Sequence, residues 1–157
     1  MQINLPNLAA TQMLGTAIAA NLRAGDVIAL TGDLGAGKTT LARAIITALG
    51  YQGEVPSPTF TIIETYDPPT TRIAVVHADF YRLQSPAEAE ELGLDDYRHN
   101  AALIAEWPDH AGGFAHEAAC LSLHICAAQE TVGPMRWVLV DAGKDWLERR
   151  LWTTLQT

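Results

Sequence analysis

Eight consecutive residues carry the clearest chemistry in this chain. Residues 32–39 read Gly-Asp-Leu-Gly-Ala-Gly-Lys-Thr and fill the pattern G-x-x-x-x-G-K-[ST], the phosphate-binding P-loop. The glycines of this loop allow backbone conformations in which successive N–H groups point at one anion. Lys38 supplies a mobile charge for the outer phosphates, and Thr39 supplies a hydroxyl for Mg²⁺, which prefers hard oxygen ligands. These residues predict that the chain binds a nucleoside triphosphate with Mg²⁺.

The segments on either side of the loop favour the same interpretation. Residues 27–30 form a short apolar run that is typical of a buried parallel strand. After the loop, Leu41, Ile45, Ala48 and Leu49 recur at helical spacing, and Gly50 stands where a helix C-cap is expected. The free N–H groups and positive dipole end of that helix would then face the phosphates.

Two carboxylates have positions that suit a metal or an attacking water. Asp79 follows the apolar run 73–76, and Glu106 follows the apolar run 102–105. In doubly wound sheets, ligand-binding groups lie at the C-terminal ends of the strands. Either residue alone could be a turn or surface carboxylate, but the two together favour a role beside the P-loop. The sequence leaves open which of them acts as the base.

Thr59 and Trp107 are further candidates for contact with a nucleotide. Thr59 lies in Ser-Pro-Thr-Phe, residues 57–60, where a nucleotide-sensing switch loop would be found, although this segment alone also suits an ordinary turn. Trp107 follows Glu106 and precedes a proline, so it either lies near the nucleotide or fills the core.

A possible zinc set in the last third of the chain fails on geometry. Cys120, His124 and Cys126 would share one face of a strand, yet a rise of about 3.3 Å per residue separates the two cysteines by about 20 Å. Zinc–ligand bonds are only about 2.0–2.3 Å long, so one ion cannot bind all three side chains. We therefore expect these residues to have structural roles.

The remaining patterns predict an α/β fold. Asn7 is expected to cap a helix with Leu14, Ala17, Ile18 and Leu22 on one face. A capping box at 85–88 starts another helix, and Asp145 is expected to cap a terminal helix that contains Arg149 and Arg150, with an apolar face formed by Leu147, Leu151 and Leu155. Strands are expected at 60–66, 120–125 and 137–140, besides the apolar runs named above. We predict a three-layer P-loop NTPase-like sandwich with a mixed, mainly parallel central sheet.

Composition limits the class of protein. The 157 residues suit a single domain spanning 1–157, and a hydrophobic content of 48% argues against disorder. The net charge of −8 argues against unaided binding of nucleic acid, because such binding relies on Lys and Arg. The acidic segment 88–96 is either a solvated helix face or a docking surface for a basic partner. The two cysteines do not make a disulfide scaffold, no apolar run is long enough to span a bilayer, and the N-terminus lacks a signal peptide, so we expect a cytoplasmic protein with no membrane contact.

Taken in order, four motifs resemble the TsaE family of small bacterial P-loop ATPases. They are the P-loop 32–40, Ser-Pro-Thr-Phe at 57–60, His-x-Asp-x-Tyr-Arg at 77–82 and Glu-Trp at 106–107. The resemblance covers about residues 5–107 and is weak after residue 112. It implies a role in threonylcarbamoyl modification of adenosine 37 in tRNA, with TsaD and TsaB as partners that make most of the tRNA contacts.

The same resemblance implies roles for individual residues. Gly35, Ala36, Gly37, Lys38, Thr39 and Thr40 would bind the triphosphate of ATP, Thr59 would belong to a switch loop, and Trp107 would lie close to the nucleotide. Thr39 and Glu106 would hold Mg²⁺, and Asp79 would hold a water of the metal or orient the attacking water. Lys38, Asp79 and Glu106 would be the catalytic group. The family implies slow ATP hydrolysis that resets the modification complex between turnovers. Arg82 is a possible arginine for the transition state, although a structural or partner contact suits it better.

Three other functions compete with this interpretation. A small-molecule P-loop kinase is the main alternative, but the chain has no arginine-rich segment that could form a lid. A GTPase would read guanine with Asn-Lys-x-Asp, which does not occur in this sequence. A degenerate P-loop that only binds nucleotide is the least favoured, because the lysine, the threonine and both acids are present.

Overall fold

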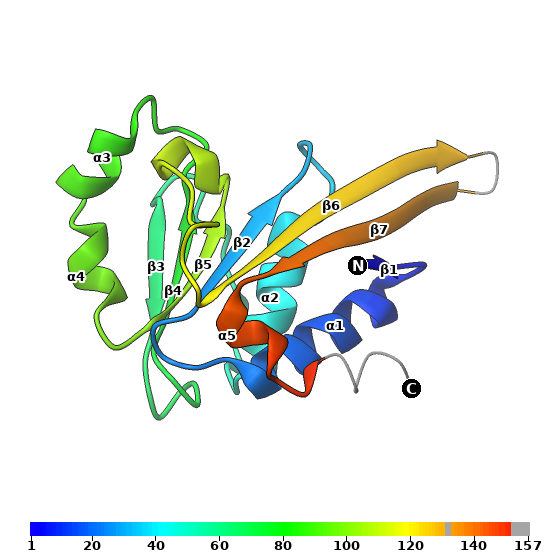
Figure 1. Cartoon of the computed structure of the whole chain (residues 1–157), viewed down its shortest axis with the longest axis horizontal. Helices are drawn as coiled ribbons and strands as arrows, with labels where there is room; N and C mark the ends of the chain where they lie inside the picture. The colour runs from blue at the N-terminus through cyan, green and yellow to red at the C-terminus, as the bar shows by residue number, and fades with distance from the viewer. Residues whose placement is uncertain (131–132, 152–157) are drawn as a thin grey trace.

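One sheet of seven strands organises the chain in a computed structural model that describes residues 1–130 and 133–151 (Figure 1). The strands, in chain order, are β1 Gln2–Asn4, β2 Val27–Thr31, β3 Ile63–Tyr66, β4 Val75–Asp79, β5 Ala102–Glu106, β6 Cys120–Glu130 and β7 Gly133–Ala142. The α-helices are α1 Leu8–Asn21, α2 Lys38–Ala48, α3 Pro86–Glu91, α4 Leu94–Arg98 and α5 Lys144–Leu147, and a 3-10 helix spans Pro108–Ala111. None of the helices in these ranges is long and apolar enough to cross a membrane.

The strand order places the P-loop strand in the middle of the sheet. The order is β1-β7-β6-β2-β5-β4-β3, and the four adjacent strands β6, β2, β5 and β4 run parallel. The pairs β3–β4, β6–β7 and β1–β7 at the two sides are antiparallel. The prediction of an α/β fold with a mixed, mainly parallel central sheet is confirmed. The C-terminal ends of β4 and β5 therefore lie at the same edge as the P-loop.

Helices cover both faces of the sheet, in agreement with the burial of four consecutive residues, Val27 to Leu30, in β2. Ile28 and Leu30 pack in a core with α1, α2 and Trp146 of α5. Val27 and Ala29 point to the opposite face and pack in a second core with Ala89 of α3, Leu94 of α4 and other apolar residues. Figure 1 shows the same separation, with α3 and α4 on one side of the sheet and α1 and α2 on the other. The predicted three layers are confirmed.

The first two helices begin and end where the sequence indicates. The Asn7 side chain caps α1 by accepting a hydrogen bond from the Ala10 N–H at 2.9 Å. All four apolar residues predicted for the inner face of α1 are buried: Leu14, Ala17, Ile18 and Leu22. Gly50 follows the C-cap of α2 with φ 116°, the left-handed conformation that ends helices and favours glycine.

One predicted boundary and one predicted capping interaction are wrong. Strand β3 starts at Ile63 instead of residue 60, because the chain makes a turn in which the Ile62 N–H bonds to the Pro58 carbonyl at 2.7 Å and Ile62 adopts φ 68°. Helix α3 does begin at Pro86, but the side chain of Ser85 makes no capping hydrogen bond. Glu88 instead accepts a bond from the backbone N–H of Gln84 at 3.3 Å, so the reciprocal capping box does not form.

The predicted terminal helix is also different. Gly143, and not Asp145, is the N-cap of α5, which ends at Leu147. Leu147 is 64% exposed, whereas Leu151 is buried, so they do not form one apolar face. Arg149 lies in a bend after the helix, and Leu155 lies outside the described residues.

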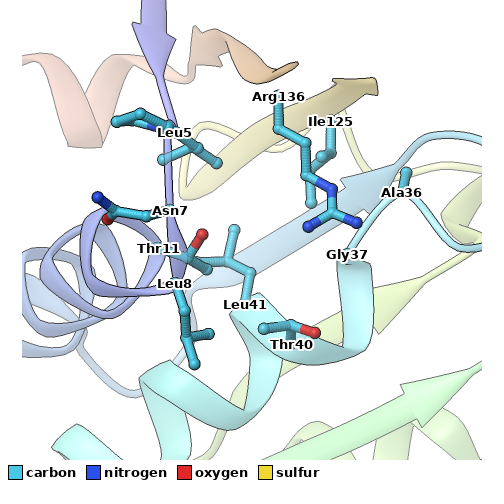
Figure 2. A pocket seen from close by; sticks show the side chains of 11 residues that line it. Leu5, Asn7, Leu8, Thr11, Ala36, Gly37, Thr40, Leu41, Ile125 and Arg136 are labelled. Carbon is cyan, nitrogen blue, oxygen red and sulfur yellow. The ribbon is translucent and has the colours of Figure 1, made fainter. Parts of the chain in front are cut away.

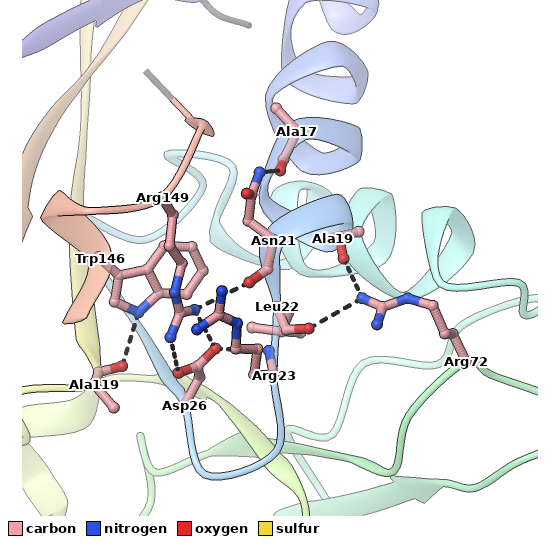
Figure 3. A network of polar contacts seen from close by, with 10 residues as sticks. All are labelled: Ala17, Ala19, Asn21, Leu22, Arg23, Asp26, Arg72, Ala119, Trp146 and Arg149. Atoms are coloured by element: carbon pink, nitrogen blue, oxygen red, sulfur yellow. Dashed lines mark hydrogen bonds and ion pairs between the residues drawn. The ribbon is translucent and has the colours of Figure 1, made fainter. Parts of the chain in front are cut away.

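A buried polar network holds the chain in place at the end of α5 and after it (Figure 3). Arg149 forms a bidentate ion pair with Asp26, at 2.5 and 2.9 Å, and also donates to the Asn21 carbonyl at 3.0 Å. Trp146 donates its indole N–H to the Ala119 carbonyl at 2.8 Å. These contacts attach the C-terminal segment to the end of α1 and the start of β2, at the sheet edge opposite to the P-loop.

Candidate functional site

The P-loop has the backbone geometry that its glycines permit. Gly32, Gly35 and Gly37 adopt φ values of 140°, 77° and 113°, which side-chain-bearing residues rarely adopt. Gly32 has a second reason to be glycine, because a Cβ there would lie 2.5 Å from the carbonyl oxygen of Ile125 in β6. The loop then leads directly into α2 at Lys38. The free backbone N–H groups at the start of this 11-residue helix are suited to binding phosphate.

The side chain of Lys38 is buried and is held against the P-loop by hydrogen bonds to two of its carbonyls. Its ammonium group donates to the carbonyls of Gly32 and Asp33 at 2.7 and 2.8 Å and lies 4.5 Å from the centre of the Trp107 ring. Burial lowers the pKa of Lys38, while the charges of Glu106, Asp79 and Asp33 act in the opposite direction. Trp107, which was predicted either to lie near the nucleotide or to fill the core, therefore lies beside the P-loop lysine.

Glu106 is fixed on both sides of its carboxylate. The Thr39 hydroxyl donates to Oε1 at 2.7 Å, and Nε2 of His77 lies 2.7 Å from Oε2. His77 and Glu106 are 0% and 2% exposed, so the contact between them is shielded from water, whereas the hydrogen bond from Thr39 is only partly buried. The other ring nitrogen of His77, Nδ1, has no hydrogen-bond partner among the described residues. The carboxylate therefore has a defined orientation beside the P-loop threonine.

Asp79 lies next to Glu106 in the register of the parallel pair β4–β5. Its Oδ1 accepts a hydrogen bond from the Tyr81 N–H at 3.0 Å, and its Oδ2 accepts one from the Thr59 hydroxyl at 3.2 Å. Thr59 also bonds to the hydroxyl of Ser57 at 2.8 Å. The segment predicted as a switch loop, residues 57–60, is thus linked to the second carboxylate by the partly buried hydrogen bond of the Thr59 hydroxyl.

Two strained backbone positions border these carboxylates. Ile62, after the Thr59 segment, and Trp107, after Glu106, have φ values of 68° and 54°. Such a conformation costs of order 1–3 kcal/mol for a residue with a bulky side chain and is found most often at functional sites. At Trp107 it turns the indole toward Lys38 and the rings of Tyr81 and His110, whose centres lie 5.1 and 5.5 Å away.

A cleft of about 250 Å³ brings most of the predicted residues together. Its lining includes nine of the predicted site residues: Gly35, Gly37, Lys38, Thr39, Thr40, Thr59, Asp79, Glu106 and Trp107. Ala36 is not part of this lining; its N–H is bonded to the Asp33 carbonyl at 3.1 Å. Arg82 is also outside it, with its guanidinium 4.3 Å from the centre of the exposed Phe60 ring. The described arginine that lines this cleft is Arg136 and not Arg82.

Two residues at the site were missed by the sequence analysis. His77 was quoted within a motif, but its contact with Glu106 was not predicted; the alternation along β4 could have indicated it, since His77 and Asp79 point to the same face. Arg136 of β7 also lines the cleft. Nothing in the local sequence around Arg136 marks it, because it approaches the P-loop only through the pairing of β6 with β2 and β7.

The oxygen groups at the cleft fit a magnesium ion that is shared with phosphates. The described residues contain no group of three or more His, Cys, Asp or Glu side chains that could hold a metal by themselves. Mg²⁺ at phosphate sites usually takes only one or two protein oxygens and completes its shell with water and phosphate. The Thr39 hydroxyl and the Glu106 carboxylate, whose oxygens lie 2.7 Å apart, could supply such a pair.

Comparison with known proteins agrees with the fold and the motifs. The family model described as threonylcarbamoyl adenosine biosynthesis protein TsaE matches residues 5–135. The tRNA threonylcarbamoyladenosine biosynthesis protein TsaE of Haemophilus influenzae is 42% identical over 96 residues, which cover 60% of this chain and 60% of that protein. The protein of the same name from Mycobacterium bovis is 40% identical over 111 residues, 66% of each chain.

A solved structure extends the likeness to nearly the whole chain. The crystal structure of Bacillus subtilis YdiB superposes with a TM-score of 0.70 at 26% identity and covers 99% of this chain and 93% of YdiB. By sequence, the chain spans about three fifths to two thirds of the length of the curated relatives that it matches. The family match covers both the P-loop and the two carboxylate-bearing strands, and on this basis the chain belongs to the TsaE family.

Proposed function

We propose that this chain is a Mg²⁺-dependent ATPase subunit that is required for threonylcarbamoyl modification of adenosine 37 in tRNA. The observation that carries the proposal is the hydrogen bond between the P-loop Thr39 and Glu106, with Lys38 and Asp79 in the same cleft. This arrangement supplies a phosphate cradle, a pair of metal ligands and a second carboxylate. The names of the TsaE relatives supply the biological process.

Each side chain has a distinct part in the proposed hydrolysis. The N–H groups of the P-loop and Lys38 bind the phosphates, and Lys38 offsets the charge that develops on the transferred group. Thr39 and Glu106 hold Mg²⁺, which when bound neutralises phosphate charge. Asp79 holds or orients the attacking water, and its hydrogen bond to Thr59 links that carboxylate to the switch loop.

The proposed partners are TsaD and TsaB, with the tRNA contacted mainly by them. An acidic chain with a net charge of −8 is poorly suited to gripping tRNA alone. In this proposal, ATP binding and hydrolysis reset the modification complex between turnovers, and the partner complex raises a slow intrinsic rate. The cytoplasm, where tRNA is modified, is the proposed location.

The test is ATP hydrolysis with Mg²⁺, measured for the protein alone and then with purified TsaD–TsaB and tRNA. We expect the complex to stimulate hydrolysis and Lys38→Ala to abolish the stimulation. Hydrolysis that ignores the partner proteins would contradict the role in tRNA modification. Transfer of the γ-phosphate to an acceptor, in a panel of nucleosides and metabolites, would instead establish a kinase.

A further inference from the structure

His77 is a buried polar residue to which the proposed hydrolysis assigns no part. It lies in the middle of β4, its side chain is 0% exposed, and all five residues of that strand are buried. Moving an imidazole from water into a core costs free energy unless its nitrogens find hydrogen-bond partners. An apolar residue would fill the same space without that cost, so the polar ring requires an explanation.

Among the described residues, the ring of His77 has one hydrogen-bond partner, the carboxylate of Glu106. Nε2 of His77 lies 2.7 Å from Oε2 of Glu106, whereas Nδ1 has no partner in the part of the chain that the structure describes. An ionised carboxylate can only accept, so the hydrogen of this contact is on Nε2. The core thus keeps a half-satisfied imidazole, and the one contact that the ring makes is with Glu106.

The register of the sheet directs His77 at this carboxylate. Strands β4 and β5 are parallel, with His77 opposite Ile104, and Glu106 follows two residues later on the same face. This face is the one that α2 covers, because Ile104 packs in the same core as Leu41 of α2. Glu106 is therefore contacted by His77 from within the sheet and by Thr39 from the start of α2.

The cavity on the other side of the P-loop offers a metal no carboxylate or imidazole. This second cavity, of about 320 Å³, adjoins the loop where the chain enters α1, and Figure 2 shows its walls. The described residues that line it include no Asp, Glu or His, although Arg136 lines both this cavity and the phosphate cleft. A cation that accompanies phosphates at the P-loop therefore finds the strand-end carboxylates only in the cleft, beside Glu106.

We propose that His77 is the positioning residue of the magnesium site. By donating from Nε2 to Oε2, it holds Glu106 so that the other oxygen, Oε1, stays beside the Thr39 hydroxyl. His77 does not line the cleft, so it acts through Glu106. The inference rests on the proposed Mg²⁺-ATP function and adds the residue that sets the affinity of this site for its metal.

The orientation of Glu106 matters because Mg²⁺ tolerates little error in its ligands. The ion requires near-ideal octahedral geometry with oxygens at about 2.0–2.1 Å, so a carboxylate that rotates is a poorer ligand. Hydrogen bonds from neighbouring residues fix the direction of a ligand, and losing one typically lowers metal affinity or activity about 10- to 100-fold. Without His77, the side chain of Glu106 would keep only the partly buried hydrogen bond from Thr39.

The test measures how strongly Mg²⁺ tightens the binding of ATP. Titration calorimetry with ATP, first with Mg²⁺ and then with a chelator, gives two Kd values whose ratio reports the contribution of the metal. His77→Gln keeps an N–H donor at the position of Nε2, because the two nitrogens stand equally far along their side chains. His77→Asn places its amide nitrogen at the position of Nδ1 and does not reach Glu106.

We expect His77→Asn to lower the effect of Mg²⁺ about 10- to 100-fold, and His77→Gln to retain most of it. ATP affinity in the chelator should be the same for both variants and the unmodified protein, because the P-loop contacts are unchanged. Val76→Ala is the matched control for a loss of core packing, since Val76 is a buried neighbour in β4 that packs on the opposite face. It should leave the effect of Mg²⁺ unchanged.

The pair of amide variants separates positioning from a merely structural role. Equal effects of Mg²⁺ in the Gln and Asn variants would overturn the inference, because a residue that only fills space makes no distinction between them. ATP binding by the unmodified protein that does not respond to Mg²⁺, or no binding of ATP, would refute the proposed function together with the inference.

A spectroscopic measurement on the unmodified protein decides the same question if the variants do not fold. Long-range ¹H–¹⁵N correlation spectra of the histidine rings show which ring nitrogen of His77 carries a hydrogen. We expect Nε2 to carry one, because Glu106 accepts a hydrogen bond there. A ring with its only hydrogen on Nδ1 would have no donor for Glu106, and this result would overturn the inference.

Discussion

At the scale of single residues, the cleft depends on a few buried charges whose hydrogen bonds fix their direction. Lys38 donates to the Gly32 carbonyl of the P-loop, and Thr39 donates to Glu106 at the end of β5. Their positions were predicted as a set, and the structure brings them together. Their functional roles remain predictions, which substitutions can test separately.

Lys38→Ala is expected to weaken the binding of Mg²⁺-ATP. Loss of a charged hydrogen-bond donor costs about 2 kcal/mol, on the order of 30-fold in Kd. Isothermal titration measures the change, and Lys144→Ala is the matched control because Lys144 is the other lysine of the chain and begins α5. Equal affinity of the Lys38 variant and the unmodified protein would remove the P-loop from the argument.

Glu106→Gln is expected to reduce Mg²⁺-dependent turnover more than nucleotide binding. The amide keeps the size of the side chain but loses the charge that holds the metal, so we expect a fall in turnover of about 100-fold. Steady-state hydrolysis and titration with ATP give the two quantities. Asp79→Asn, measured in parallel, shows which carboxylate is the base. Normal turnover in the Glu106 variant would reject its assignment as a metal ligand.

At the scale of elements, close contact between α1 and α2 carries part of the fold. A Cβ at Gly15 of α1 would lie 2.6 Å from the Cβ of Ala44 and 2.9 Å from its carbonyl carbon. Gly15→Ala raises helix propensity by about 1 kcal/mol, but pushing the helices apart should outweigh it and give a net loss of about 1–3 kcal/mol. Urea unfolding measures the loss. Thr16→Ala, the next residue and exposed, should be neutral or stabilising; the same result for Gly15→Ala would show that the helices can separate without cost.

The ion pair between Asp26 and Arg149 joins the C-terminal segment to the sheet. The Arg149 and Asp26 side chains are 5% and 2% exposed, so Arg149→Ala leaves a buried carboxylate without its partner and should cost about 3–5 kcal/mol in the free energy of unfolding. Arg98→Ala, which breaks a more exposed pair with Glu117, should cost about 1 kcal/mol or less. Denaturant unfolding compares the two, and similar losses would argue that burial of the first pair is unimportant.

At the scale of the whole molecule, charge predicts how the protein meets tRNA. With a net charge of −8, it has few cations with which to displace counterions, and we expect binding of free tRNA on the order of 10⁻⁵ M or weaker at about 150 mM salt. Filter binding with tRNA alone, and then with TsaD–TsaB present, tests this. Tight binding by the isolated protein would place the tRNA contact on this chain and not on its partners.

The amino-acid sequence by itself determined the features that depend on residues close together along the chain. The P-loop glycines, the strand before it and the helix after it follow from local backbone rules, as does the Asn7 cap of α1. The carboxylates at the ends of β4 and β5 could be found because each follows an apolar run. The end of α5 could not be predicted from the sequence, because the bidentate contact of Arg149 with Asp26 joins residues that are 123 positions apart.

Only the tertiary structure decided which distant segments meet at the P-loop. The pairing of β5 with β2 places Glu106 against Thr39, and the pairing of β6 with β2 and β7 carries Arg136 to the same loop. Strand order is set by contacts between residues far apart in sequence, and no local pattern encodes the partner of a strand. A single arginine on an antiparallel hairpin therefore carries no signal until the sheet is assembled, when it lies at the junction between the phosphate cleft and the adjoining cavity.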